Sequence, residues 1–169
     1  MGYLEITPSL IGSLAECYYK EYCDQKGGWA YTSLEQIHKS DFADGKLEFK
    51  IGFQRFKIKI PNEIIEEIRK LSQPVFVKPN NPSYVFDFLA CKMYQEDENL
   101  TDILDRRVDD FSWVEVKSRG GRLSKNQLLA SMHVTLPVTF CVINNIRSEP
   151  NRVRIDFYYN EIPEDMINE

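Results

Sequence analysis

The sequence lacks the features of a secreted, membrane-spanning or zinc-binding protein. It has four cysteines, with no Cys-x-x-Cys pair and no zinc-ligand spacing to either histidine. It has no apolar run of about eighteen residues and no basic, apolar leader, so it predicts neither a membrane span nor a secretory signal. We therefore expect a cytoplasmic protein with no membrane partner, whose cysteines are reduced, small and buried: Cys17, Cys23, Cys91 and Cys141.

The chain also carries no excess of positive charge. The net charge is −5 at pH 7, which argues against a general nucleic-acid coat protein, because such proteins bind through a broad basic surface. An enzyme that meets nucleic acid through one local basic patch is compatible with this charge. The length of 169 residues and the apolar fraction of 43% suit a single domain over residues 1–169 with its own core.

Several common catalytic arrangements are absent. No Ser–His–Asp or Cys–His set can be argued, and Gly120-Gly121 reads as a turn rather than as a glycine-rich phosphate loop. We expect His133 to be structural at the end of a helix and His38 to be a solvated loop residue. Three aromatic residues near strand ends are expected in the core rather than stacked on bases: Trp29, Tyr31 and Trp113.

The hydrophobic pattern predicts an α/β chain. Helices are expected over 10–26, 61–71 and 124–134, and strands within 46–60, 84–91, 113–118, 136–144 and 152–159. The alternation within 46–60 changes phase near Gln54 and Arg55, which indicates a bulge or a tight hairpin.

The ends of these elements are also predicted. Ser9 is expected to cap the first helix, and Ser124 to cap the third through an S-x-x-Q capping box with Gln127. Residues 95–110 are strongly acidic and predict an inserted loop with a helical turn, and the tail after Pro163 is expected to fray.

The stretch FSWVEVKSRGGRLSKNQLL, residues 111–129, contains most of the candidate catalytic and binding residues. Glu115 and Lys117 are two apart and therefore share one face of the predicted strand. Upstream, Asp87 lies inside an apolar strand, where a lone carboxylate costs several kcal/mol to bury unless it is neutralised. If the two strands are neighbours, Asp87 and Glu115 converge, and a divalent cation is their natural partner.

Two simpler interpretations stand beside this one. Glu-x-Lys is a common pattern and occurs again at Glu48 and Lys50, in a segment whose alternation places both side chains in solvent. The basic residues after Lys117 are ordinary loop charges in most proteins. Here they cluster where a phosphate backbone would pass the site: Arg119, Arg122 and Lys125.

Asp87 with Glu115-Val116-Lys117 resembles the core of the PD-(D/E)xK nuclease superfamily, and EVKSRGGRLSKNQ is similar to its VRR-NUC branch. The resemblance covers residues 84–144. It implies a restriction-endonuclease-like core, related to Holliday-junction resolvases, with a small mixed central sheet flanked by helices. It also implies hydrolysis of DNA phosphodiester bonds, in duplex or branched and flapped DNA, with Mg²⁺ or Mn²⁺ as cofactor.

The resemblance assigns roles to individual residues. Asp87 and Glu115 become metal ligands, Lys117 the catalytic lysine and Gln127 the helix residue that supports the site. The backbone carbonyl of Val116 is a further candidate ligand. Glu16, on the first helix, is another, although a surface carboxylate is an equal interpretation because Glu16 lies off the apolar stripe.

The sequence departs from the family pattern in three places. Phe86 stands where the family has proline, and the spacing from Asp87 to Glu115 is long, so that Asp109 or Asp110 is an alternative ligand. Residues 45–71 have no counterpart and are candidates for substrate binding or for a homodimer interface. Two alternative functions follow: a non-catalytic DNA-binding or assembly module on the same fold, and an RNA-directed nuclease.

Overall fold

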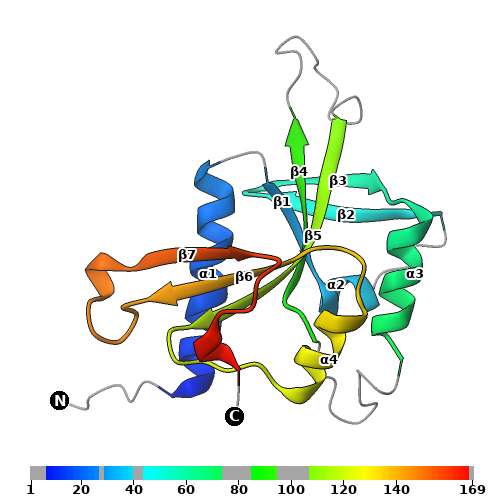
Figure 1. The fold of residues 1–169 in the computed structure, drawn as a ribbon. Coiled ribbons are helices and arrows are strands. Elements are labelled where there is room, and N and C mark those ends of the chain that lie inside the picture. The colour runs from blue at the N-terminus through cyan, green and yellow to red at the C-terminus, as the bar shows by residue number, and fades with distance from the viewer. Residues whose placement is uncertain (1–6, 27–28, 40–43, 74–84, 95–106, 168–169) are drawn as a thin grey trace.

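The computed structural model describes residues 7–26, 29–39, 44–73, 85–94 and 107–167 (Figure 1). Its helices are α1 (Pro8–Lys26), α2 (Leu34–Lys39), α3 (Asn62–Leu71) and α4 (Lys125–His133), with short 3₁₀ turns at Pro150–Arg152 and Glu164–Met166. Its strands are β1 (Trp29–Ser33), β2 (Lys46–Ile51), β3 (Gln54–Lys59), β4 (Phe88–Tyr94), β5 (Arg107–Ser118), β6 (Val138–Asn144) and β7 (Arg154–Tyr159).

The strands form one seven-stranded sheet in the order β3-β2-β1-β4-β5-β6-β7. The β5–β6 pair is parallel and every other pair is antiparallel, so the sheet is mixed. The parallel pair needs a crossover, which α4 provides. The prediction of an α/β chain with a mixed central sheet flanked by helices is therefore confirmed.

A separate hydrophobic core lies on each face of the sheet. The larger core joins the sheet to α2, α3 and α4, and the smaller core joins it to α1 (Figure 1). Alternate residues of β5 serve the two cores, with Trp113 in the larger core and Val114 and Val116 in the smaller one. Glu115 is two positions after Trp113 and therefore faces the same side of the sheet. This explains how an apolar strand carries a buried carboxylate.

A buried carboxylate ties α3 to the centre of the sheet. Glu67 is 5% exposed. Its oxygens accept hydrogen bonds from Trp113 Nε1 at 2.8 Å, from Thr135 Oγ1 at 2.9 Å and from the Thr135 backbone N–H. Because the indole N–H of the fully buried Trp113 would otherwise have no partner, Glu67 fixes β5 two residues before Glu115.

Several predicted elements are confirmed. The phase change near Gln54 is a hairpin between β2 and β3, with Gly52 at a φ of 57° in the turn. The apolar stripe of α3 is buried at Ile64, Ile68 and Leu71, and β6 is buried along its whole length. Ser124 and Gln127 form the predicted capping box.

Other predictions about elements are wrong. β1 and α2 were not predicted, because the burial of β1 does not alternate along the strand and the six residues of α2 make fewer than two helical turns. His38 is therefore a helix residue, half-buried and 3.3 Å from Ser72 Oγ. Thr7, rather than Ser9, caps α1, since Thr7 Oγ1 accepts from the Leu10 N–H.

Predictions about the burial of the cysteines, the order of the C-terminal tail and the start of β5 are also wrong. Cys17 is exposed, whereas the other three cysteines are buried, and all four are free thiols. Over residues 164–167, the described part of the tail after Pro163, the chain does not fray, because Met166 is buried and its carbonyl accepts from the Leu123 N–H. Residues 107–110 belong to β5 rather than to an acidic loop, and 95–106 lie outside the described residues.

Trp113 and Tyr31 are core residues, as predicted, and Trp29 is half-buried. His133 ends α4, and its backbone carbonyl accepts from Lys70 Nζ. None of the described helices combines the length and apolar character needed to cross a bilayer.

The Glu67 network gives a stability prediction. Glu67→Ala should lower the free energy of unfolding by about 3 kcal/mol, because it leaves the buried Trp113 indole N–H without an acceptor and removes the link to the Thr135 backbone. The matched control is Glu66→Ala, whose side chain is less buried one position earlier on α3. Urea denaturation measures both, and equal, small losses in the two variants would contradict the role assigned to Glu67.

Candidate functional site

Asp87 and Glu115 lie opposite each other at the end of the β4–β5 pair. Phe88 pairs with Val114 in an antiparallel register, so the next position on each chain places Asp87 across from Glu115, and the two carboxyl groups interact electrostatically. The Asp87 N–H donates to the Val114 carbonyl at 3.0 Å, and Asp87 Oδ2 accepts from the Val116 N–H at 2.7 Å. The predicted convergence of the two carboxylates is therefore present, although Asp87 precedes β4 instead of lying inside it.

Two aromatic neighbours hold Asp87 in place from opposite faces of the sheet. The Phe86 ring stacks on Trp113 in the larger core, with 5.9 Å between centroids. The Phe88 ring stacks on Tyr19 of α1 in the smaller core, at 5.1 Å. Phe86 therefore anchors the segment at the position where proline was expected.

The two carboxylates line a cleft of about 810 Å³. It is bounded by the first turns of α1, the end of β5, the turn after β5 and the connection after β6. The carboxylates that line it are Glu16, Asp87 and Glu115. Its cations are Lys117, Arg119, Arg122 and Arg147.

Burial and mutual repulsion disfavour charge on the paired carboxylates. Burial raises the pKa of Asp87 well above its usual range, and the Glu115 charge and the contact with Glu16 raise it further. Burial also raises the pKa of Glu115, to about 7, although Lys117 and Gln127 lower it. Because the two sites interact, they share protons as a pair. A bound cation would relieve this repulsion.

Lys117 joins the carboxylates on the same face of β5. Its Nζ lies 3.2 Å from Glu115 Oε1, and Glu115 is 3% exposed while Lys117 is 23% exposed. The other oxygen, Glu115 Oε2, is buried and has no hydrogen-bond partner among the described residues. An unpaired buried carboxylate oxygen is costly, and such an oxygen suits a hard divalent cation as a ligand.

The glycine pair after β5 shapes the space around Lys117. Ser118 to Gly121 forms a turn, closed by the Gly121 N–H donating to the Ser118 carbonyl at 2.9 Å, with Gly120 at a φ of 92°. This is the position of a type II turn that glycine favours. A Cβ on Gly121 would lie 3.3 Å from Lys117 Cδ and 3.0 Å from the Ser118 oxygen. Both glycines therefore hold the turn close against the lysine stem.

Gln127 supports the site from the start of α4. Its Oε1 accepts from the Ser124 N–H at 3.0 Å, and its Nε2 donates to the Val85 carbonyl at 3.1 Å. Gln127 also lowers the pKa of Glu115 by hydrogen bonding. One amide thus links the helix cap to the segment that carries Asp87 and to the second carboxylate.

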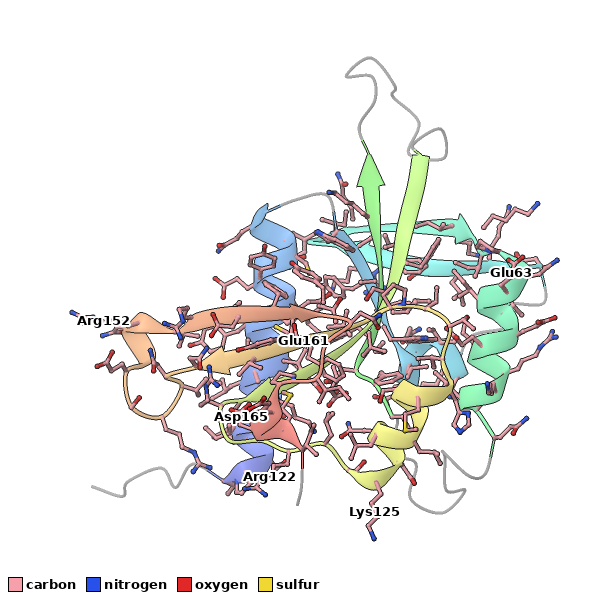
Figure 2. The ribbon with its side chains drawn as sticks, in the orientation of Figure 1. Glu63, Arg122, Lys125, Arg152, Glu161 and Asp165 are labelled. Atoms are coloured by element: carbon pink, nitrogen blue, oxygen red, sulfur yellow. The ribbon has the colours of Figure 1, made fainter. Side chains whose placement is uncertain are left out.

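The predicted basic residues differ in their positions and contacts. Arg119 Nε donates to Asn144 Oδ1 at 2.6 Å, and its other nitrogens pair with Asp165 and Asp156, so it ties the C-terminal segment to β6 and β7. Arg122 lines the cleft near the start of α1, whereas Lys125 points away from the start of α4 (Figure 2). Lys125 is therefore not a lining residue.

The remaining candidates are placed as follows. Glu16 is half-buried, lines the cleft and contacts Asp87, so it is not a simple surface carboxylate. Val116 also lines the cleft. Asp109 and Asp110 lie in β5, well before Glu115 along the strand, and their side chains are outside the described residues.

Arg147, in the connection between β6 and β7, was not predicted. It lines the cleft, and its side chain is exposed. A single arginine in a loop carries no sequence pattern, so only the folding of β6 beside β5 brings it to the carboxylates.

Over the described residues, no group of three or more His, Cys, Asp and Glu side chains is arranged to hold a metal ion. Mg²⁺ commonly needs only one or two protein carboxylates, with water and substrate phosphate as its other ligands. Asp87 and Glu115 provide such a pair. Compared with known proteins, the chain matches no family model, no curated protein sequence and no solved structure.

The raised pKa values predict an unusual pH dependence of stability. Because the folded pKa of Asp87 and of Glu115 exceeds the unfolded value of about 4, these groups favour folding while protonated. That contribution is lost as the pH rises through about 7 and above. In EDTA, wild type should lose more than about 1 kcal/mol relative to Asp87→Asn between about pH 5 and about pH 9.

Urea denaturation across this pH range measures the effect, with the exposed Glu63→Gln as a control that should follow wild type. Parallel pH profiles for wild type and Asp87→Asn would contradict the raised pKa of Asp87.

Proposed function

We propose that the protein is a metal-dependent nuclease with a restriction-endonuclease-like core, similar to the VRR-NUC branch of the PD-(D/E)xK superfamily. The observation that carries the proposal is the meeting of Asp87, Glu115 and Lys117 at one end of β5. Their cleft also holds an unpartnered carboxylate oxygen, and cations line its walls. Acidic ligands beside basic phosphate-binding groups are what hydrolysis of a phosphodiester requires.

The residues have distinct roles in this proposal. Asp87 and Glu115 would hold Mg²⁺ or Mn²⁺, with Glu16 and the Val116 carbonyl as further ligands. When bound, the cation would polarise the scissile phosphate and lower the pKa of a water molecule. Glu115 orients Lys117 through their ion pair, so that the ammonium group can stabilise the charge that builds on the phosphate oxygens.

The surroundings position these groups. Gln127 holds the Val85 segment, and Phe86 and Phe88 fix Asp87 on either side. Arg122 and Arg147 lie on two different loops around the cleft, where they can contact the phosphates of a bound strand. DNA is the proposed substrate, and a homodimer remains a prediction that no described contact tests.

The decisive assay incubates the full chain with single-stranded, duplex, flap and four-way DNA, and with matched RNA, in Mg²⁺, Mn²⁺ or EDTA. Cleavage of DNA that requires the metal supports the proposal. Metal-dependent cleavage of RNA alone would select the RNA-directed nuclease. DNA binding without cleavage or metal binding would select the non-catalytic module.

Lys117→Ala should reduce the cleavage rate by at least about 100-fold, because it removes a charge aimed at the developing phosphate charge. DNA affinity in EDTA should stay within about threefold, since one phosphate contact contributes little to the total. Arg152→Ala removes an exposed cation at the far end of the β6–β7 connection and serves as the control (Figure 2). Full activity in Lys117→Ala would remove Lys117 from the mechanism.

Metal binding can be tested without activity. Saturating Mn²⁺ at about 100 times its Kd should stabilise wild type by about 2.7 kcal/mol. Asp87→Asn and Glu115→Gln should lose most of this gain, whereas Glu63→Gln, an exposed carboxylate on α3, should keep it (Figure 2). Thermal denaturation with and without Mn²⁺ measures the difference, and equal stabilisation of all variants would contradict the assigned ligands.

A further inference from the structure

The outward face of the β2–β3 hairpin is strongly basic in an otherwise acidic chain. The inward residues Leu47, Phe49 and Ile58 pack in the larger core. At the outward positions of the two strands, the only acidic side chain is Glu48. The cations at these positions are Lys46, Lys50, Arg55, Lys57 and Lys59, all exposed.

The register brings like charges directly against each other. Lys46 pairs with Lys59, and Lys50 pairs with Arg55. Like charges at directly opposite positions destabilise an antiparallel pair. Glu48 lies directly opposite Lys57 and 3.8 Å from Arg55, and it relieves only part of this repulsion, because these side chains are exposed and a single carboxylate faces five cations. A bound polyanion would turn the repulsion into favourable contacts.

Lysines on an outer strand also block the pairing of one sheet with another. That role concerns β3, which is at the edge of the sheet. It does not explain Lys50, because Lys50 of β2 has a strand partner on each side, Tyr31 of β1 and Arg55 of β3.

The basic face opens into a groove of about 240 Å³ between the hairpin and α1. Lys20 of α1, Lys50 and Arg55 line this groove, and Lys20 Nζ lies 5.6 Å from the centroid of the Phe88 ring. The opposite face of the hairpin is covered by α3. The groove is therefore on the α1 side of the sheet.

The groove adjoins the carboxylate cleft. Glu16 lines the cleft and Lys20 lines the groove, one helical turn apart on the same side of α1. Asp87 lines the cleft and its neighbour Phe88 lines the groove. A strand leaving the carboxylates can therefore pass Lys20 and reach the hairpin.

An exposed aromatic residue lies at the end of this path. Phe53, in the turn between β2 and β3, is fully exposed. Aromatic rings beside a basic groove are typical of surfaces that track a nucleic-acid backbone and stack on its bases. Continuity with the cleft favours a nucleic acid over an acidic membrane surface as the occupant.

We propose that the outward face of the β2–β3 hairpin binds the phosphate backbone of a nucleic-acid strand that extends from the carboxylate cleft past Lys20. This inference rests on the proposed function for the choice of ligand. Within residues 45–71, it gives the β2–β3 hairpin a substrate-binding role.

The test compares two double variants with equal loss of charge. Lys50→Ala with Arg55→Ala removes cations from the basic face. Arg69→Ala with Arg152→Ala removes exposed cations from α3 and from the connection after β6, outside the cleft and groove linings. Fluorescence anisotropy in EDTA measures binding of labelled single-stranded DNA, duplex DNA and single-stranded RNA, each about thirty nucleotides long.

The hairpin variant should bind at least about tenfold more weakly than wild type at low salt. Its plot of log affinity against log salt should flatten by about 0.7 to 0.9 for each phosphate that the variant no longer neutralises. The control variant should match wild type in both measurements. The DNA and RNA arms identify which backbone is bound, and thermal denaturation checks that both variants are folded.

Equal affinity of the two variants for every nucleic acid would overturn the inference. Binding of the wild type to anionic lipid vesicles, with no nucleic-acid affinity, would also overturn it. Cleavage assays test the proposed function separately. If wild type cleaves nucleic acid but both variants bind it equally, the nuclease function is supported and the role of the basic face is contradicted. If wild type binds through Lys50 and Arg55 but does not cleave, the role of the basic face is supported and the nuclease function is contradicted.

Discussion

Two carboxylic acids face each other across the end of the β4–β5 pair, where Glu115 is buried and Asp87 is half-buried. Asp87 and Glu115 cannot both ionise there without opposing positive charge, and burial raises the pKa of each. Lys117 supplies part of that charge through Glu115 Oε1, and Oε2 has no hydrogen-bond partner within the described part of the chain. Replacing buried ionic groups by apolar residues of similar volume is often neutral or stabilising, so this pair is weak evidence of a stabilising role. The remaining structure can be understood as the scaffold that keeps this pair together.

That scaffold is drawn from segments far apart in the sequence. Glu67 of α3 binds the indole of Trp113 and fixes the strand before Glu115. Gln127 of α4 binds the Val85 carbonyl and fixes the segment before Asp87. Each contact satisfies buried polar groups, so each resists movement of the carboxylates.

The charge of the chain is unevenly distributed, which its net value of −5 conceals. Acidic and basic side chains together line the cleft, while cations cover the outward face of the β2–β3 hairpin. The same hairpin buries Leu47 and Phe49 against α3 on its other face. Strand alternation thus lets one hairpin complete the core and present a basic surface. An acidic protein can in this way offer a local path to a polyanion.

The sequence by itself determined the features that depend on neighbouring residues: the shared face of Glu115 and Lys117, the capping box at Ser124, the hairpin near Gln54 and the apolar stripe of α3. These follow from local periodicity and local hydrogen bonding. Short elements such as β1 and α2 gave no periodic signal. Tertiary structure alone decided that Asp87 lies opposite Glu115, that Glu16 and Arg147 join the same cleft, and that Arg119 is held by Asp156 and Asp165. The physical reason is that strand register and helix docking are set by the packing of the whole core, which brings together residues that no local pattern connects.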